Sequence, residues 1–408
     1  MVLVTAGYPC GTPTETAFIS PEITALAREF SRVIILPSSK PSPGAHAAPL
    51  PANVEVDLRF AEMMERRAAR LRFAMHPLLA GAAVDALLHG YSPFSAATFS
   101  AAALAWRREM MQALDNGFVD PRTTLFYTFW LDYATAGLAL LSHDRPIDIV
   151  SRVHGYELRD LRSPMLRRLT AGSVRAIYAA SRSAQRFLHD LYPAEKERIM
   201  LRHMGSADPL PFTEGAACAP DGSIALLSVA RVIPLKRVDM VRDLARSLAR
   251  LLPDTPVSWT HIGGGSAMAE LTASVAGPLE PNLKVELAGE TPNDEIHRIM
   301  SSRHFDWNIL LSTTEGGVPV SLCEGASYGI PAIATDVGGI SELVDDSTGV
   351  LVDANPDPAA VAARIAAISE ADRRRKGEAI RSRWQERFAA GRLRGEFARN
   401  LAEGRWKW

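Results

Sequence analysis

The sequence has few cysteines, almost no net charge and no long apolar run. Its three cysteines, Cys10, Cys218 and Cys323, form no CxxC pair, which argues against a disulfide framework and against a zinc site. A formal net charge of -1 gives no overall attraction to nucleic acid. No apolar segment reaches the ~20 residues that a membrane-spanning helix needs, and the first residues lack the charged lead of a signal peptide. These absences predict a cytoplasmic protein, soluble or at most peripheral to a membrane.

The length and the composition indicate a globular protein of two domains. The 408 residues, 47% of them hydrophobic, exceed what one core of about 200 residues usually covers. A stretch rich in Pro, Gly and Ala, without periodicity, follows residue 205 and is typical of a linker. We therefore predict an N-terminal Rossmann-like domain over 1–205, a linker over 206–222, a second Rossmann-like domain over 223–385 and a helical tail over 386–408.

The first half alternates buried strands with helices. Strands are expected at 2–5, 33–36, 124–130, 147–150 and 176–181, the last of this half, with a helix-rich region over 54–114. The Gly-rich loop from Gly7 to Thr16 follows the first strand, where doubly wound domains gather their ligands. A tight turn without a ligand explains its glycines equally well.

A histidine stands at the end of another strand of this half. His154 is followed by Gly155, so a rigid strand would hold the imidazole while the glycine admits a ligand closely. Imidazole can donate or accept a hydrogen bond near neutral pH, which suits sugar hydroxyls. A purely structural histidine is the alternative.

The second half restarts the pattern, with strands expected at 224–229, 257–262, 283–289, 307–312, 332–335 and 349–352. Arg231 and Lys236 lie on its first strand-to-helix turn, where two cations and a helix start together favour phosphate. Two ordinary surface charges on a solvated loop are the alternative. The triple glycine that ends at Gly265 is not a dinucleotide fingerprint, but it lets a flat base approach the backbone.

The stretch from Ser312 to Glu324 carries the strongest signal for a ligand. Glu315 and Glu324 stand at the two ends of a Gly- and Pro-containing loop that is expected to run into a helix. Such a helix start offers free backbone N–H groups and a positive dipole end. An anion flanked by hydroxyls, as in a nucleotide sugar, fits this pattern.

Two basic segments complete the pattern. Arginines are mixed with apolar residues at helical spacing from Met63 to Phe73, around Arg66, and the tail from Glu370 to Trp408, around Arg394, is basic and helical. Basic amphipathic helices can lie on anionic membranes, although a solvated arginine face is commoner. Trp384, Phe388, Phe397 and Trp406 are expected to pack the tail back onto the molecule.

Taken together, these motifs resemble glycosyltransferase family 4, the retaining family with the GT-B fold. The resemblance rests on Arg231 to Lys236, on His261-Ile-Gly-Gly-Gly265, on Ser312-Thr-Thr-Glu315-Gly to Glu324, and on Gly338-Gly339-Ile-Ser-Glu342. In the first half, Gly7-Tyr-Pro-Cys-Gly11 and Arg152-Val-His154-Gly155-Tyr156 look like the corresponding loops. The resemblance implies two Rossmann-like domains that face an interdomain cleft, with the C-terminal helix crossing back to the first domain.

The resemblance also implies roles for individual residues. The implied catalytic residues are His154, beside the transferred sugar, Glu315, Arg231 and Lys236. The implied donor-binding residues are Arg231 and Lys236 on the diphosphate, Glu324 on the ribose, and Gly263, Gly265, Glu315, Gly316, Gly317, Val318, Pro319 and Val320. The implied acceptor or cleft-loop residues are Gly11, Thr12, Glu15, Thr16 and Tyr156. Eight residues separate the two glutamates, one more than the family pattern has, so the position of Glu315 is less secure than that of Glu324.

The implied reaction is transfer, with retention, of a sugar from a UDP or GDP donor to a hydroxyl of a glycan or lipid-linked sugar. By resemblance it serves bacterial exopolysaccharide, capsule or lipopolysaccharide synthesis, at most in peripheral contact with the inner face of the cytoplasmic membrane. Neither a metal nor a cofactor is expected, and nucleic acid is not an expected partner. A phosphorylase or sugar-phosphate synthase on the same fold, and a sugar-nucleotide-binding subunit without activity, are the alternatives.

Overall fold

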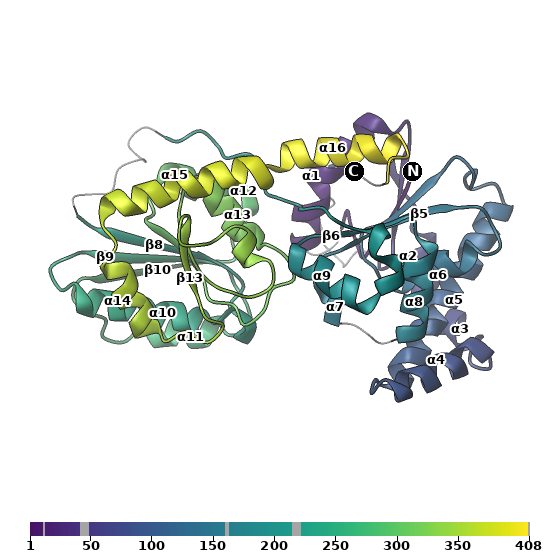
Figure 1. Cartoon of the computed structure of the whole chain (residues 1–408), viewed down its shortest axis with the longest axis horizontal. Helices are drawn as coiled ribbons and strands as arrows, with labels where there is room; N and C mark the ends of the chain where they lie inside the picture. Colours follow the sequence, from purple (N-terminus) through teal and green to yellow (C-terminus); the bar gives the residue numbers. More distant parts are fainter. Residues whose placement is uncertain (11–12, 41–48, 160–162, 214–221, 407–408) are drawn as a thin grey trace. The chain divides into compact units, whose positions relative to one another are not determined.

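The protein forms two α/β units. The computed structural model describes residues 1–10, 13–40, 49–159, 163–213 and 222–406. Unit 1 contains residues 1–202 and 394–408, and unit 2 contains residues 203–393 (Figure 1). The predicted linker therefore begins inside unit 2, and its residues 214–221 lie outside the described ranges.

Unit 1 is built on a parallel sheet in the order β3-β2-β1-β4-β5-β6-β7. Its strands are β1 (Val2–Thr5), β2 (Val33–Pro37), β3 (Val54–Val56), β4 (Leu125–Thr128), β5 (Asp148–Val153), β6 (Ala176–Ala179) and β7 (Ile199–Leu201). The inner strands are runs of buried residues, as expected for a sheet covered on both faces. The prediction that 176–181 is the last strand of this half is wrong. β3 and β7 are three-residue edge strands, too short to show a period in the sequence.

Helices cover the unit 1 sheet. They are α1 (Pro13–Glu29), α2 (Arg59–Glu65), α3 (Arg67–Leu71), α4 (Pro77–Leu88), α5 (Pro93–Asp115), α6 (Tyr133–Leu141), α7 (Tyr156–Arg159), α8 (Pro164–Ser173), α9 (Arg182–Leu191) and the 3-10 helix η1 (Pro193–Arg198). The main core cluster of unit 1 includes Trp106 of α5, whose ring stacks on Phe60 of α2 at 4.2 Å between centroids. The helix-rich region predicted over 54–114 is confirmed from residue 59 onward.

Unit 2 repeats the design with a parallel sheet in the order β10-β9-β8-β11-β12-β13. The strands are β8 (Ile224–Val229), β9 (Val257–Ile262), β10 (Leu283–Gly289), β11 (Trp307–Leu310), β12 (Ala332–Thr335) and β13 (Gly349–Val352). Its helices are α10 (Val238–Leu251), α11 (Met268–Val275), α12 (Asn293–Ser302), α13 (Val320–Ser327), α14 (Pro358–Ala366), α15 (Glu370–Arg387), and the 3-10 helices η2 (Pro234–Lys236) and η3 (Ile340–Glu342). Helices α10, α11 and α14 lie on one face of the sheet, and α12, α13 and α15 on the other (Figure 1).

Strand order reverses once in each sheet, and this reversal positions the candidate sites. In unit 1 the chain moves outward from β1 to β3 and returns to pair β4 beside β1, and in unit 2 β11 returns beside β8. At such a point the loops after two neighbouring strands diverge and leave room for a ligand at the carboxyl ends of the strands. The predicted loops 7–16, 231–236 and 312–320 follow three of these strands.

The C-terminal segment returns to unit 1, as the sequence predicts. Helix α16 (Ala390–Ala402) enters unit 1 from Arg394 onward. Its Phe397 ring lies 5.7 Å from that of Tyr127 and 5.1 Å from that of Tyr178, both in unit 1. Trp384 and Phe388 are buried instead in unit 2, where the Trp384 indole donates to Ser206 Oγ at 2.9 Å. Within the described residues, no helix combines the length and apolar character that crossing a bilayer requires.

Candidate functional site

A lysine and a glutamate meet at the strand-order reversal of unit 2. Lys236 ends η2, which follows β8, and Glu315 lies in the loop that follows β11. Because β8 and β11 are neighbours, the two loops emerge side by side, and Lys236 Nζ forms an ion pair with Glu315 Oε1. The side chains keep 18% and 14% of their surface exposed, so solvent or a ligand can still reach the pair. The structure thus joins two residues that the sequence placed in separate motifs.

Arg237, the next residue, holds the two loops together. Its backbone is left-handed, with φ 47°, and it caps the start of α10. The guanidinium donates to the carbonyl oxygens of Leu311 (2.6 Å), Ser312 (3.0 Å) and Ala354 (2.6 Å). Sequence reasoning missed this residue, because nothing in the spacing shows that its side chain turns toward a loop more than seventy positions away.

Arg231 remains on the surface. It is exposed, and the described part of the chain offers its side chain no hydrogen bond or ion pair. Two glycines shape its turn: a Cβ on Gly263 would lie 1.9 Å from Ala230 O, and one on Gly265 would lie 2.4 Å from Val232 O. Both have φ above 130°, where other residues are strained. The glycines therefore allow the loop after β9 to pack backbone to backbone against the loop that carries Arg231.

Glu324 is held in place by α12. It lies on α13 with 5% of its surface exposed, and its Oε1 accepts from Asn293 Nδ2 at 2.8 Å. His297 Nε2 lies 3.6 Å from the same oxygen. No described residue donates a hydrogen bond to the other oxygen, Oε2. The sequence analysis did not predict Asn293 and His297. Their signal is weak: an acid-rich helix start four residues after β10, with the imidazole one turn further on.

The loop between the two glutamates starts a helix without a side-chain cap. Pro319 is the N-cap of α13 and Val320 is its first residue, so Gly316, Gly317 and Val318 form the approach to the helix; all five residues are half-buried. On the other side, Gly338 contacts this loop: a Cβ there would lie 2.1 Å from Glu315 O. The Gly338-Gly339 motif of the sequence is therefore a packing partner of Glu315.

In unit 1 His154 lies among aromatic rings. Its ring centroid is 4.5 Å from that of Phe129, 4.6 Å from that of Trp130 and 6.1 Å from that of Phe18. Glu157 accepts from the backbone N–H groups of His154 (3.2 Å) and Gly155 (3.1 Å), and its Oε1 lies 3.5 Å from His154 Nδ1. Nε2 is buried without a hydrogen-bond partner among the described residues.

Glu157 orients this imidazole. Burial alone would raise the pKa of the Glu157 carboxyl, but hydrogen bonds from His154 and from backbone N–H groups outweigh it and lower the pKa. An ionised Glu157 favours the tautomer with the proton on Nδ1, which leaves Nε2 as an acceptor. Sequence reasoning missed Glu157; an acid three residues after a strand-end histidine was the available signal.

Glu15 organises the first loop. Its Oε1 accepts from Ala6 N (2.8 Å) and from Trp130 Nε1 (2.9 Å), and its Oε2 accepts from Gly7 N (2.8 Å). The side chain is buried, so these contacts fix the loop after β1. Thr16 is half-buried on α1, and Tyr156 is the first residue of α7. The predicted residues Gly11 and Thr12 lie outside the described residues.

Asp132, the N-cap of α6, provides a prediction on pH. Burial raises the pKa of its carboxyl to about 7, against hydrogen bonds from the N–H groups of Ala134 and Thr135 that lower it. An unfolded aspartate has a pKa of about 3.9. Between these values the folded state holds a proton that the unfolded state lacks, so the free energy of unfolding falls as the pH rises from about 4 to about 7.

We expect Asp132→Asn, which keeps a capping oxygen, to remove this part of the pH dependence. Urea unfolding of both proteins between pH 5 and pH 8 measures it, with a difference in slope of at most about 1.4 kcal/mol per pH unit. Parallel stability profiles would show that Asp132 is ionised in the folded protein throughout.

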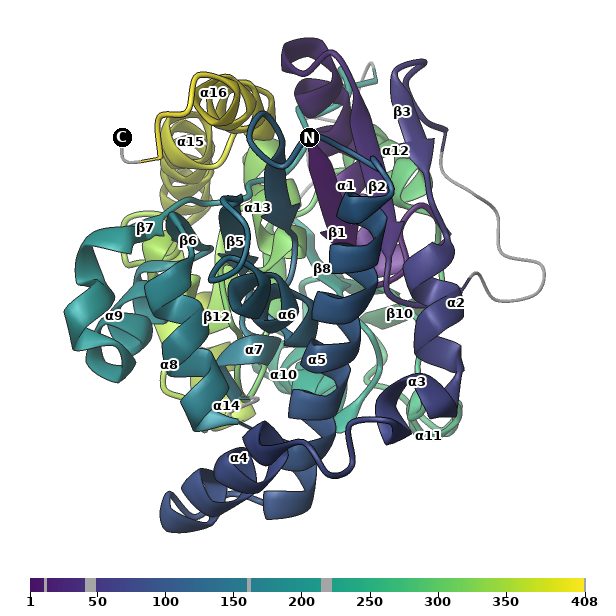
Figure 2. The same cartoon turned by 90° about the vertical axis from the view of Figure 1, so that its right-hand side faces the viewer.

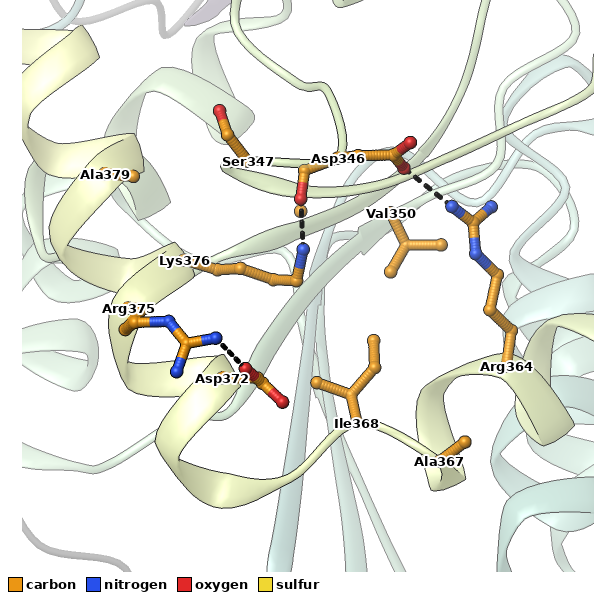
Figure 3. A pocket seen from close by; sticks show the side chains of 11 residues that line it. Asp346, Ser347, Val350, Arg364, Ala367, Ile368, Asp372, Arg375, Lys376 and Ala379 are labelled. Atoms are coloured by element: carbon orange, nitrogen blue, oxygen red, sulfur yellow. Dashed lines mark hydrogen bonds and ion pairs between the residues drawn. The ribbon is translucent and has the colours of Figure 1, made fainter.

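Unit 2 also contains a hollow away from these residues. It lies between β13, α14 and α15 and is lined by Asp346, Ser347, Gly349, Val350, Arg364, Ala367, Ile368, Asp372, Arg375, Lys376 and Ala379 (Figure 3). Its charges satisfy one another: Arg364 pairs with Asp346 at 2.7 Å, and Arg375 pairs with Asp372. None of the predicted donor residues lines it. Nor do the described residues hold a group of three or more His, Cys, Asp or Glu that could bind a metal ion.

Comparisons with known proteins find a family to which most of unit 2 is similar. Residues 216–384 match the family model described as "Glycosyl transferases group 1". The amylovoran biosynthesis glycosyltransferase AmsK of Erwinia amylovora is 29% identical over 184 residues, 44% of each chain. The putative colanic acid biosynthesis glycosyltransferase WcaL of Escherichia coli K12 is 30% identical over 43% of each chain. The match thus spans less than half the length of these relatives.

The fold comparison extends over nearly the whole chain. The crystal structure of Anabaena Alr3699/HepE in complex with UDP superposes with a TM-score of 0.64 and covers 99% of this chain and 100% of that one. At 15% sequence identity this likeness concerns the fold. The chain therefore has the GT-B fold, and its residues 216–384 are similar to the glycosyl transferases group 1 family.

Proposed function

We propose that this protein is a retaining glycosyltransferase that moves a sugar from a nucleoside diphosphate sugar to a hydroxyl of a surface polysaccharide or lipid-linked sugar. The observation that carries the proposal is the Lys236–Glu315 pair at the strand-order reversal of a group 1 domain, beside the start of α13. This arrangement offers a cation, a carboxylate and free backbone N–H groups within one pair of loops.

On the donor side, Lys236 and Arg231 bind the diphosphate. Lys236 is already half-buried and paired with Glu315, so an incoming phosphate takes over its ammonium and leaves Glu315 free to accept from a sugar hydroxyl. Arg231 is exposed and adds a second cation from the same turn. Together they stabilise the negative charge that develops on the leaving diphosphate. No metal is part of the proposal.

Glu324 binds the ribose. Asn293 fixes its Oε1, and Oε2 is left to accept from the ribose hydroxyls. In unit 1 His154 contacts the transferred sugar through Nε2, with Glu157 holding Nδ1. A buried acceptor nitrogen without a partner carries a desolvation cost that a sugar hydroxyl removes.

In the proposed reaction the acceptor hydroxyl attacks the anomeric carbon on the face from which the phosphate departs. The bond from that carbon to the phosphate oxygen breaks, the bond to the acceptor oxygen forms, and the hydroxyl proton passes to the leaving phosphate. This route needs no protein nucleophile. The names of AmsK and WcaL favour an exopolysaccharide acceptor, and the HepE complex favours UDP as the nucleotide. The proposed place of sugar transfer is the cytoplasmic side of the membrane.

The test is a two-step donor screen on the whole chain. A ligand that binds only the native state raises the melting temperature by mass action, so UDP, GDP and ADP are compared first. The nucleotide that stabilises the protein is then supplied as its sugar conjugates, and nucleoside diphosphate release is measured with polysaccharide or lipid-linked acceptors. Binding without turnover for every pair would favour a sugar-nucleotide-binding subunit, and the absence of any stabilisation would contradict the donor site itself.

A further inference from the structure

Unit 1 has an exposed apolar surface that binding of a nucleotide-sugar donor does not explain. Seven large hydrophobic side chains between residues 71 and 94 are exposed, among them Met75 at 95%, Leu88 at 78% and Phe94 at 78%. They lie on α3, on α4, on the start of α5 and between these helices. In both views α4 lies at the outer edge of unit 1 (Figures 1 and 2). We call residues 71–94 the apolar tip.

Helix α4 carries apolar residues on its buried side and on its outer side. Ala82 and Ala86 are fully buried where the helix packs on α5 and α8. At 100° per residue, Val84, Leu87 and Leu88 point to the opposite side, with exposures of 58%, 66% and 78%. A surface helix normally turns charged residues to the water on that side, and a helix that is apolar all round is usually covered.

The one charged residue of α4 does not reach the outer face. Asp85 is paired with Arg168 of α8 at 2.6 Å, and its side chain is 16% exposed. The outer face of α4 therefore presents carbon atoms without an acidic group.

Three arginines lie at the N-terminal end of the tip, two just before it and one within it. Arg66, Arg70 and Arg72 are exposed around α3, and none of the three forms an ion pair with a described residue. Arg394, the other basic position that the sequence suggested for a membrane, is only 7% exposed, so it cannot contribute to such a surface. The arginines around α3 are therefore the cations that we consider for an anionic partner of the tip.

We infer that the apolar tip is a membrane-docking surface that inserts Leu87, Leu88 and Phe94 among the acyl chains of an anionic bilayer, with Arg66, Arg70 and Arg72 on its headgroups. An apolar face bordered by unpaired cations fits an anionic lipid surface, which accepts both. A second copy of the chain fits less well, since a two-fold contact would bring the same arginines together. The inference adds a membrane surface to the proposed function. It depends on that function only in that a lipid-linked acceptor would lie at the same membrane.

The test is sedimentation of the full chain with vesicles of phosphatidylcholine that contain about one third phosphatidylglycerol. We expect the protein to bind, and the triple variant Leu87→Ser/Leu88→Ser/Phe94→Ser to bind at least about tenfold more weakly. Arg66→Gln/Arg70→Gln/Arg72→Gln should lose the preference for anionic over neutral vesicles. The matched control is Leu251→Ser/Phe212→Ser, two exposed apolar residues of unit 2, which should bind like the unaltered protein.

Several outcomes would overturn the inference: no binding by the unaltered protein, equal binding by the triple variant, or a concentration-dependent dimer that the triple variant abolishes while vesicles bind neither. Because the substituted side chains are exposed, the triple variant should keep its melting temperature and the nucleotide shift described above. Vesicle binding without any nucleotide shift would contradict the proposed function alone, and a nucleotide shift without vesicle binding would contradict this inference alone.

Discussion

Lys236→Ala is expected to lower the rate of sugar transfer by about 10²–10³-fold at saturating donor, the usual cost of removing one electrostatic contact to a transition state. Lys236 is the only lysine at the β8–β11 reversal among the described residues, and its ammonium lies beside Glu315 in the loops where the diphosphate is proposed to bind. The loss should appear mainly in kcat, because charge on the leaving diphosphate grows as the bond breaks. Initial rates across donor concentrations separate kcat from KM.

The matched control is Lys284→Ala, an exposed lysine of β10 in the same unit, which should leave the rate unchanged. Glu315→Gln provides the reverse test. It releases Lys236 from its ion pair, so nucleoside diphosphate should bind at least as tightly as before, while transfer falls through the lost sugar contact. Equal rates for Lys236→Ala and Lys284→Ala would contradict a role for the pair in catalysis.

The sheets were largely predictable because their inner strands are buried on both faces. Segments such as Val2–Thr5 and Ala332–Thr335 are continuous apolar runs, and their boundaries agree with the prediction. β3 and β7 were missed because a three-residue edge strand has only one neighbour and too few residues to show a period. The return of the C-terminal segment was predicted because its aromatic residues require burial, and Phe397 packs against Tyr178 of unit 1.

The candidate site was predictable only in part. Topology alone brings the loops after β8 and β11 together, so a meeting of the motifs of Lys236 and Glu315 follows once the strand order is known. The sequence does not show which side chains turn inward to fix these loops. Arg237 and Glu15 both fix loops by hydrogen bonds to backbone groups. Every residue has such groups, so the residue types in the sequence do not show which of them will be bound. The roles of the individual site residues stay predictions until they are tested.

Arg152→Met is expected to lower the free energy of unfolding of unit 1 by about 3–5 kcal/mol, the usual cost of leaving a buried charge without its partner. Arg152 NH2 donates to Glu22 Oε2 at 3.0 Å, and both side chains are 2% exposed. Tyr127 completes the network: its hydroxyl accepts from Arg152 Nε at 2.8 Å and donates to Glu22 Oε1 at 2.6 Å. The guanidinium carbon also lies 4.2 Å from the Phe397 ring centroid, so the network supports α16 as well.

The double variant Arg152→Met/Glu22→Leu separates the ion pair from its surroundings. Replacing both buried charges by apolar groups is often close to neutral, so the double variant should be clearly more stable than Arg152→Met alone. In Arg152→Met the buried Glu22 carboxyl keeps its hydrogen bond from Tyr127 but has no counter-ion. Amide hydrogen exchange in β1 and β5 reports the opening of unit 1 in each variant. If the changes in the free energy of unfolding from the two substitutions were simply additive, Arg152 and Glu22 would not stabilise each other, which would contradict the prediction. The contribution of unit 1 to holding α16 would then come from aromatic packing alone.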